Sequence, residues 1–198
     1  MNIASGRRYR MVGRAKNVVA TGERILDAAV EAFWERPSDQ ISLDDVASRA
    51  SVSVQTVIRR FGGKDGLLAA AIERESERVR RERDPAAVTD AAGAVTQLVT
   101  HYEAMGDRVL RMLAEEARVP VLRRVVDRGR RAHRDWCEVV FASALAGLSA
   151  GQRKRRVAQL VAVCDVYTWK LLRRDCGLSR EETELALLEL LRPLLEVP

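Results

Sequence analysis

The stretch that most constrains the fold of this chain runs from Ile41 to Lys64 and predicts two short helices joined by a tight turn. Ser42 followed three residues later by Asp45 is a helix-start pattern, because the hydroxyl accepts from a free backbone N–H and the carboxylate bonds back. After an interruption, Ser53 is a suitable cap for a second helix over 54–61. The apolar residues of the first helix recur at helical spacing and are Leu43, Val46, Ala47 and Ala50.

The second of these helices has two contrasting sides. At about 100° per residue, one arc is apolar and the opposite arc carries amide, hydroxyl and guanidinium groups. The apolar arc holds Val54, Val57, Ile58 and Phe61, and the polar arc holds Gln55, Thr56, Arg59 and Arg60. A helix of this kind is typical of one that lies in the major groove of DNA, although a surface helix whose arginines meet only water has the same pattern. Because the length, turn and capping all agree, we predict a helix-turn-helix.

The segment also resembles a known family. Together with a helix over 25–34 before it and the sequence GGKDGLL after it, it resembles the N-terminal domain of TetR-family transcriptional regulators. The resemblance covers residues 21–71. It implies a repressor that binds a palindromic operator as a homodimer and is released by a small, largely apolar effector, with no cofactor. The alternative from another class is a DNA-binding protein without small-molecule regulation.

The residues and the resemblance together suggest the DNA contacts. Gln55 and Arg59 point outward from the second helix and suit adenine and guanine edges respectively. The resemblance assigns Ser53, Thr56 and Lys64 to phosphates. We place Ser42 on the same surface, and Arg60 suits either a base or a phosphate.

Three residues depart from the pattern of the family. Ser51 stands where a turn glycine is common, so a left-handed backbone there costs about 1 kcal/mol. Ile58 replaces a tyrosine that often reaches a phosphate, and that contact is therefore lost. Gly63 replaces a serine cap before Lys64, at a cost of a few tenths of a kcal/mol, roughly.

The composition fits a DNA-binding protein of a reducing compartment. The formal net charge is +6, and residues 1–64 hold 11 basic and 7 acidic residues, so the excess is concentrated beside the predicted helix-turn-helix. The three cysteines, Cys137, Cys164 and Cys176, are too few and too scattered for a disulfide framework or a metal site. No run of about 18 apolar residues and no signal peptide are visible, so we expect a cytoplasmic protein with no membrane partner.

The chain divides into three predicted segments. Residues 1–20 are expected to form a basic flexible tail, which as an alternative reaches into a minor groove. The first helix is expected to begin near Thr21 and to end before Pro37, which cannot continue the helical hydrogen bonds. The helix-turn-helix DNA-binding domain then spans 21–67, and a C-terminal helical effector-binding and dimerisation domain spans 68–198.

The C-terminal segment reads as helical throughout. Glycine and proline mark breaks near Gly93, Gly106, Pro120, Gly147 to Gly151 and Gly177. The candidate helices are 86–102, 107–117, 121–145, 152–175 and 179–195. No stretch alternates with a period of two, so we predict an all-α fold of about nine helices.

The sequence contains no motif for enzymatic chemistry. Nucleophile elbows, phosphate-binding glycine loops and HExxH motifs are absent, and we predict neither an enzyme nor a metal site. A carboxylate–histidine cluster in the bundle would revive an enzyme hypothesis. His101 is expected to be an ordinary hydrogen-bonded residue. His133 lies in an apolar seam and needs a partner, either a protein group or a bound molecule.

Two further sites are expected in the C-terminal segment. The resemblance implies an effector cavity, for which the candidate residues are Tyr102, Met112, His133, Trp136 and Trp169. In helices 152–175 and 179–195, apolar residues cover more of the helix surface than the one side that would pack on the core of the same chain. We therefore expect a four-helix interface between two copies. Its candidate residues are Val163, Tyr167, Leu187, Leu191 and Leu194.

Overall fold

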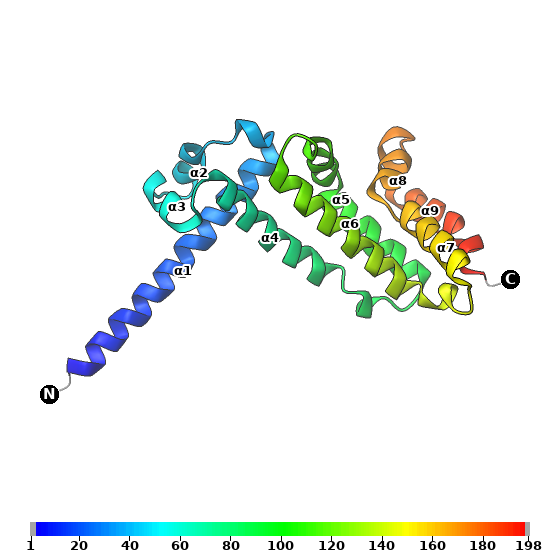
Figure 1. Cartoon of the computed structure of the whole chain (residues 1–198), viewed down its shortest axis with the longest axis horizontal. Helices are drawn as coiled ribbons and strands as arrows, with labels where there is room; N and C mark the ends of the chain where they lie inside the picture. The colour runs from blue at the N-terminus through cyan, green and yellow to red at the C-terminus, as the bar shows by residue number, and fades with distance from the viewer. Residues whose placement is uncertain (1–2, 197–198) are drawn as a thin grey trace. The chain divides into compact units, whose positions relative to one another are not determined.

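The computed structural model describes residues 3–196, and every regular element within this range is helical (Figure 1). The all-α prediction is therefore confirmed. The chain divides into two units, Met1–Glu75 and Ser76–Pro198, and the division falls a few residues after the boundary expected at residue 67. No helix in the described range is long and apolar enough to cross a membrane.

The first unit contains the predicted helix-turn-helix. Helix α1 packs on α2, and α2 packs on α3. The elements of this unit are α1 (Ile3–Glu35), η1 (Ser38–Gln40), α2 (Leu43–Arg49), α3 (Val54–Phe61) and the first part of α4 (Lys64–Glu82). Its core is made by small and branched apolar side chains, which include Ile25, Ala29, Phe33, Val46, Val57, Leu67 and Ile72.

Helix α1 begins much earlier than expected. Its helical backbone starts at Ile3 rather than near Thr21, so the residues expected to form a flexible tail continue the helix. The reason is that no proline occurs before Pro37, and residues 7–19 are mostly good helix formers that extend a helix already nucleated against the core.

The turn between α2 and α3 has the strained backbone that the sequence suggested. Ser51 has a φ of 53°, in the left-handed region that favours glycine. Its N–H donates to the Ser48 carbonyl, and the N–H of Val52 donates to the Ala47 carbonyl at 2.9 Å. These bonds close the turn between α2 and α3 and hold the serine in place.

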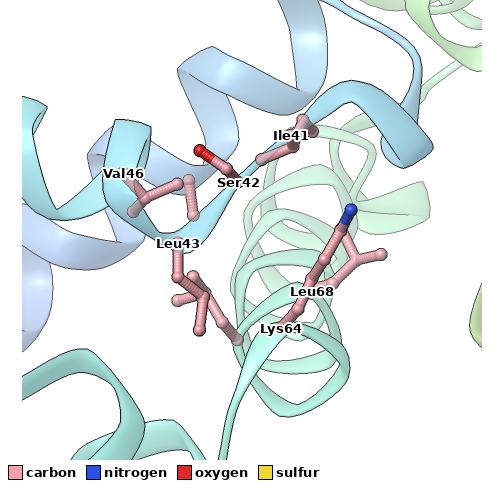
Figure 2. Close-up of a pocket in the computed structure, with 8 residues that line it drawn as sticks. Ile41, Ser42, Leu43, Val46, Lys64 and Leu68 are labelled. Atoms are coloured by element: carbon pink, nitrogen blue, oxygen red, sulfur yellow. The ribbon is translucent and has the colours of Figure 1, made fainter. Parts of the chain in front are cut away.

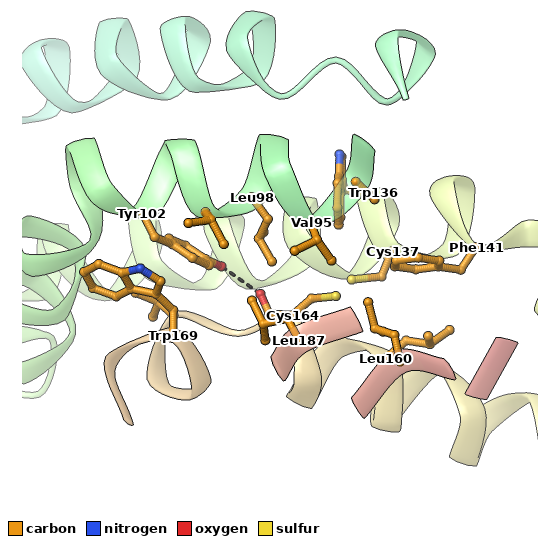
Figure 3. Close-up of a cluster of buried hydrophobic side chains, with 14 of the residues drawn as sticks. Val95, Leu98, Tyr102, Trp136, Cys137, Phe141, Leu160, Cys164, Trp169 and Leu187 are labelled. Atoms are coloured by element: carbon orange, nitrogen blue, oxygen red, sulfur yellow. Dashed lines mark hydrogen bonds between the residues drawn. The ribbon is translucent and has the colours of Figure 1, made fainter. Parts of the chain in front are cut away.

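The second unit is a helical bundle in which α5 contacts α6, α8 and α9. Its elements are the end of α4, η2 (Pro85–Ala87), α5 (Ala91–Glu115), α6 (Pro120–Val140), η3 (Ala142–Leu145), α7 (Ala150–Val163), α8 (Val166–Lys170), the π-helical turn η4 (Leu171–Asp175) and α9 (Arg180–Leu195). Figure 3 shows its core, which includes Val95, Leu98, Tyr102, Trp136, Phe141, Leu160 and Trp169.

The breaks predicted at Gly93 and Gly106 are absent, since α5 runs through both. At Gly106 the missing side chain makes room for a neighbour. A Cβ built on Gly106 would lie 2.4 Å from Cζ3 of Trp169, so the glycine lets α8 approach α5 closely. The two helices predicted over 86–102 and 107–117 are therefore one.

The helix predicted over 152–175 is divided instead. It ends at Val163 and a new helix starts at Val166, because the Asp165 side chain caps α8 by accepting from the Tyr167 N–H at 2.9 Å. The Tyr102 hydroxyl donates to the Cys164 carbonyl at 3.0 Å and satisfies an acceptor at this break (Figure 3). Similarly, the helix predicted over 121–145 ends at Val140 and is followed by η3.

Candidate functional site

Ion pairs join α1 to α2 within the first unit. Arg49 reaches the Glu35 carboxylate at 2.6 Å and Asp45 at 3.3 Å, and Arg36 also contacts Asp45. The Arg49 guanidinium lowers the pKa of the Glu35 carboxyl by hydrogen bonding and charge. Ser42 caps α2 as predicted, because its hydroxyl accepts from the Asp45 N–H at 3.1 Å. These contacts orient the helix on which α3 rests.

Helix α3 begins with a double interaction between Ser53 and Thr56. The Ser53 hydroxyl accepts from the Thr56 N–H at 3.2 Å, and the two side-chain oxygens lie 2.9 Å apart. Val57 is fully buried beneath the helix. The helix ends at Gly62, whose φ of 78° gives a left-handed cap. Residues 54–61 therefore form a short rigid helix anchored on one side.

The outer face of α3 carries the residues expected to read bases. Gln55, Arg59 and Arg60 are exposed. Arg60 extends toward α1, where its guanidinium lies over Gly22 so closely that a Cβ there would meet it at 2.3 Å. Ile58 is also on the surface, 39% exposed, and not on the anchored side as its place in the apolar arc suggested. Ile58 therefore adds an apolar side chain to the outer face of α3. The helical pattern alone did not predict this exposure.

The structure brings Ser42 and Lys64 to the edge of one small hollow. Figure 2 shows it, with apolar side chains of α2 and α4 making most of the lining, among them Leu43, Val46, Leu67 and Leu68. The Lys64 amine donates to the Asp39 carbonyl at 3.4 Å, which ties the start of α4 to η1. The hollow is the packing contact of α2 with α4, and it places two of the predicted DNA contacts near each other.

Three of the residues expected to bind an effector are part of the core of the second unit. Tyr102, Trp136 and Trp169 are each no more than 5% exposed, and the ring centroids of Tyr102 and Trp169 are 5.8 Å apart. Burial raises the pKa of the Tyr102 hydroxyl. Met112 is half-buried. The described packing therefore uses these aromatic rings to join α5, α6 and α8.

His133 has a partner within the protein, which was one of the two alternatives predicted for it. Its Nδ1 lies 3.2 Å from an Nη atom of Arg83, and its ring stacks beside Trp136 with an angle of 11° between the planes. The Arg83 guanidinium lies over the Trp136 ring, 4.7 Å from the centroid. Sequence reasoning missed Arg83, since it follows a long charged run with no periodicity to single it out.

Two of the expected dimer residues lie inside the chain itself. Leu187 and Leu191 are 1% and 0% exposed within the core of the second unit, which corrects their assignment to a surface between copies. The buried arc of α9 faces α5 and α7, and these leucines lie on it. Val163 and Leu194 are half-buried, and Tyr167 is 56% exposed.

Several known proteins are similar to this chain. Residues 25–71 match the model of the bacterial regulatory proteins of the tetR family. An HTH-type transcriptional regulator of Mycobacterium tuberculosis is 34% identical over 68 residues, which are 34% of each chain. An HTH-type transcriptional repressor of the same species is 26% identical over 162 residues, which are 82% of this chain and 64% of the repressor. The match thus spans less than two thirds of both relatives.

Solved structures show the same fold over most of the chain. A transcriptional regulator from Rhodococcus sp. Rha1 has a TM-score of 0.66 at 23% identity, covering 89% of this chain and 99% of that one. The SmeT–triclosan complex has a TM-score of 0.66 at 20% identity, covering 88% and 91%. Residues 25–71, with their capped helix-turn-helix, are therefore similar to the DNA-binding segment of the tetR family of bacterial regulatory proteins.

Proposed function

We propose that this protein is a transcriptional repressor that binds a palindromic operator as a homodimer and is released by a small-molecule effector. The observation that carries the proposal is the outer face of α3. Gln55 and Arg59 are exposed there on a helix whose opposite side is anchored by Val57 and whose start is capped by Ser53. A rigid helix with these side chains suits the major groove.

The groups around α3 suit the DNA backbone. Thr56 and Ser53 present hydroxyls at the N-terminus of the helix, where the helix dipole favours a phosphate. Lys64 and Ser42 lie at the neighbouring edge. The exposed Ile58 adds an apolar contact suited to a thymine methyl group. Arg60, which extends along α1, is assigned to a phosphate.

Exposed apolar side chains support pairing of two copies through the second unit. Four large ones, Tyr167, Leu171, Leu185 and Leu190, are between 47% and 56% exposed on α8, η4 and α9. Soluble monomers rarely leave extensive apolar surface in water. The proposed interface therefore uses these residues together with Val163 and Leu194 at its margin, in place of the buried Leu187 and Leu191.

Response to an effector is supported by likeness to proteins of the same fold. The SmeT structure contains triclosan, and the M. tuberculosis relative bears the name of repressor. An effector needs only to favour, by a few kcal/mol, a state in which two α3 helices are wrongly spaced for successive major grooves, about 34 Å apart.

The experiment that tests the DNA-binding part is selection of binding sites from random duplexes, followed by titration of the selected duplex. Enrichment of an inverted repeat bound by two chains is the expected result. An enriched site without symmetry, or binding that does not distinguish the selected duplex from random DNA, contradicts the proposal.

A DNA-binding protein without small-molecule regulation is the second candidate. Dense packing of the rings of Tyr102, Trp136 and Trp169 favours it, because these side chains already fill the space in which an effector was expected. The two candidates differ in one measurement. If operator affinity stays constant across a library of small molecules that bind the chain, the protein is not ligand-responsive.

A further inference from the structure

Three side chains of the second unit form a cluster of cationic and imidazole groups. It consists of Arg83, which follows the end of α4, His101 on α5 and His133 on α6. Arg83 bonds His133 and covers the face of Trp136, as described above. We refer to these three residues as the Arg83 cluster.

Arg83 is a half-buried arginine without an acidic partner. Among the described side chains it forms no ion pair, whereas Arg173, which is also half-buried, bonds the Glu103 carboxylate at 2.8 Å. Its neighbour Glu82 pairs with Arg78 instead. A half-buried guanidinium is usually paired, because removing it from water without an anion is costly.

Two nitrogen atoms of the cluster are hidden from water and have no hydrogen-bond partner among the residues that the structure describes. They are Nε of Arg83 and Nδ1 of His101, and His101 as a whole is only 9% exposed. Buried polar atoms in folded proteins nearly always have a partner. Both atoms donate when His101 is in its Nδ1–H tautomer, so each suits an acceptor oxygen.

The electrostatic potential at the cluster is positive. The pKa of His101 falls to about 3, first because of burial and then because of the charges of Arg83, Arg78 and His133. The pKa of the Cys137 thiol is lowered mainly by its hydrogen bond with Cys164 and, among smaller causes, by the charge of Arg83; at Tyr102, where burial raises the pKa, Arg83 opposes the rise. A cation is therefore repelled here and an anion is attracted.

We propose that the Arg83 cluster binds the carboxylate of a small organic acid, which makes organic acids the effector class of this regulator. The planar guanidinium presents parallel N–H groups that match a carboxylate. The Trp136 ring beneath the guanidinium is only 5% exposed and supports it, so the rest of the acid extends outward from the cluster. His133 and Arg83 are half-buried at the protein surface, so the acid enters past them. The proposal rests on the ligand-responsive function proposed above.

The test is calorimetric titration of the full chain, without DNA and at constant ionic strength. The probes are benzoate and hexanoate, with benzamide and hexanamide as their uncharged counterparts and inorganic phosphate as a purely ionic one. We expect at least one carboxylate to bind at least tenfold more tightly than its amide and than phosphate. If neither does so, the proposal is wrong.

Variants locate the binding. Arg83→Gln is expected to weaken carboxylate binding at least tenfold, and Arg81→Gln, which removes the same charge from an exposed residue nearby, is expected to leave it unchanged. Should Arg83→Gln fail to fold, Arg83→Lys is expected to bind several-fold more weakly, because it keeps the charge but loses the planar fork. Equal binding by wild type and the folded Arg83 variant overturns the assignment.

A nitrogen NMR shift of His101 Nδ1 on adding benzoate provides a second readout at the site, and an unchanged shift at saturation excludes His101 from it. Because none of these measurements uses DNA, failure to bind carboxylates is distinguishable from failure to bind an operator. Titrating the selected duplex with and without benzoate then tests the regulatory link alone.

Discussion

Gly106 on α5 and Trp169 on α8 approach each other so closely that the indole occupies the space of the missing side chain. Gly106→Ala is therefore expected to destabilise the protein by about 1–3 kcal/mol through overpacking, although alanine is the better helix former. Urea unfolding measures the difference. Trp169 is fully buried and also donates toward Glu103 at 3.4 Å, so it has little freedom to move aside.

Gly129 on α6 is the matched control. A Cβ built there meets nothing within 4 Å, so Gly129→Ala is expected to stabilise the chain by about 0.5–1 kcal/mol. If both alanine variants shift stability in the same direction, contact with Trp169 is not the reason that residue 106 is a glycine.

A second prediction concerns sequence reading by α3. Arg59→Ala and Gln55→Ala are each expected to cost about 1–3 kcal/mol at one base pair of the selected site and to relax the preference there. Thr56→Val is expected to weaken binding to all duplexes alike, since a phosphate contact carries no sequence information. Repeating site selection with each variant separates the two effects. An Arg59→Ala protein with an unaltered site preference contradicts the assignment of that side chain to a base.

The third prediction separates the core from the proposed dimer surface. Leu187→Ala is expected to reduce the free energy of unfolding by about 2–5 kcal/mol, because the side chain is buried within one chain. Leu185→Glu and Leu190→Glu change exposed residues, and we expect each to preserve the helical circular dichroism while producing monomers. Light scattering after gel filtration reports the mass. Folded dimers from both glutamate variants place the interface elsewhere.

The fourth prediction is a dependence of stability on pH. The folded state holds the pKa of His101 near 3, below its ordinary value of 6.5, so between these values the unfolded chain binds more protons. The contribution of His101 to the free energy of unfolding is therefore lost as the pH falls below 6.5. At pH 5 the loss is about 2 kcal/mol. The groups whose charges act on it are Arg78 and Arg83 from the α4 segment and His133 from α6.

The measurement compares wild type with His101→Gln by chemical unfolding at pH 7.5 and pH 5.0. Acidic residues titrate in both proteins, so their effect cancels in the comparison. The wild type is expected to lose more stability on acidification than the variant. Equal losses mean that His101 is accessible to protons in the folded state.

Local signals in the sequence predicted the helix-turn-helix well. Caps at Ser42 and Ser53, the turn at Ser51 and the burial of Val57 all depend on residues close in the chain, and each is present in the structure. The exposure of Ile58 was not predicted, because a helical wheel shows which residues share a side but not how far the neighbouring helices extend over it.

Prediction was weaker in the second unit, where the outcome depends on long-range packing. The glycine at 106 looks like a helix breaker until Trp169, more than sixty residues away, is placed against it. The leucine-rich α9 has apolar residues on several sides, so its pattern could not reveal that Leu187 and Leu191 face the chain's own core. Nor did composition distinguish Arg83 from the arginines that surround it in the sequence.

The unbroken path of α5 through Gly106 has a consequence for local opening of the protein. Because α5 contacts α6, α8 and α9, its central amides are exposed to solvent only when the whole second unit opens. Hydrogen–deuterium exchange is therefore expected to be slowest around Leu98 and Tyr102, and to be fast near Gly177, in the exposed turn before α9. Although its glycines suggested a weak helix, α5 is thus expected to be the last to exchange its amide hydrogens.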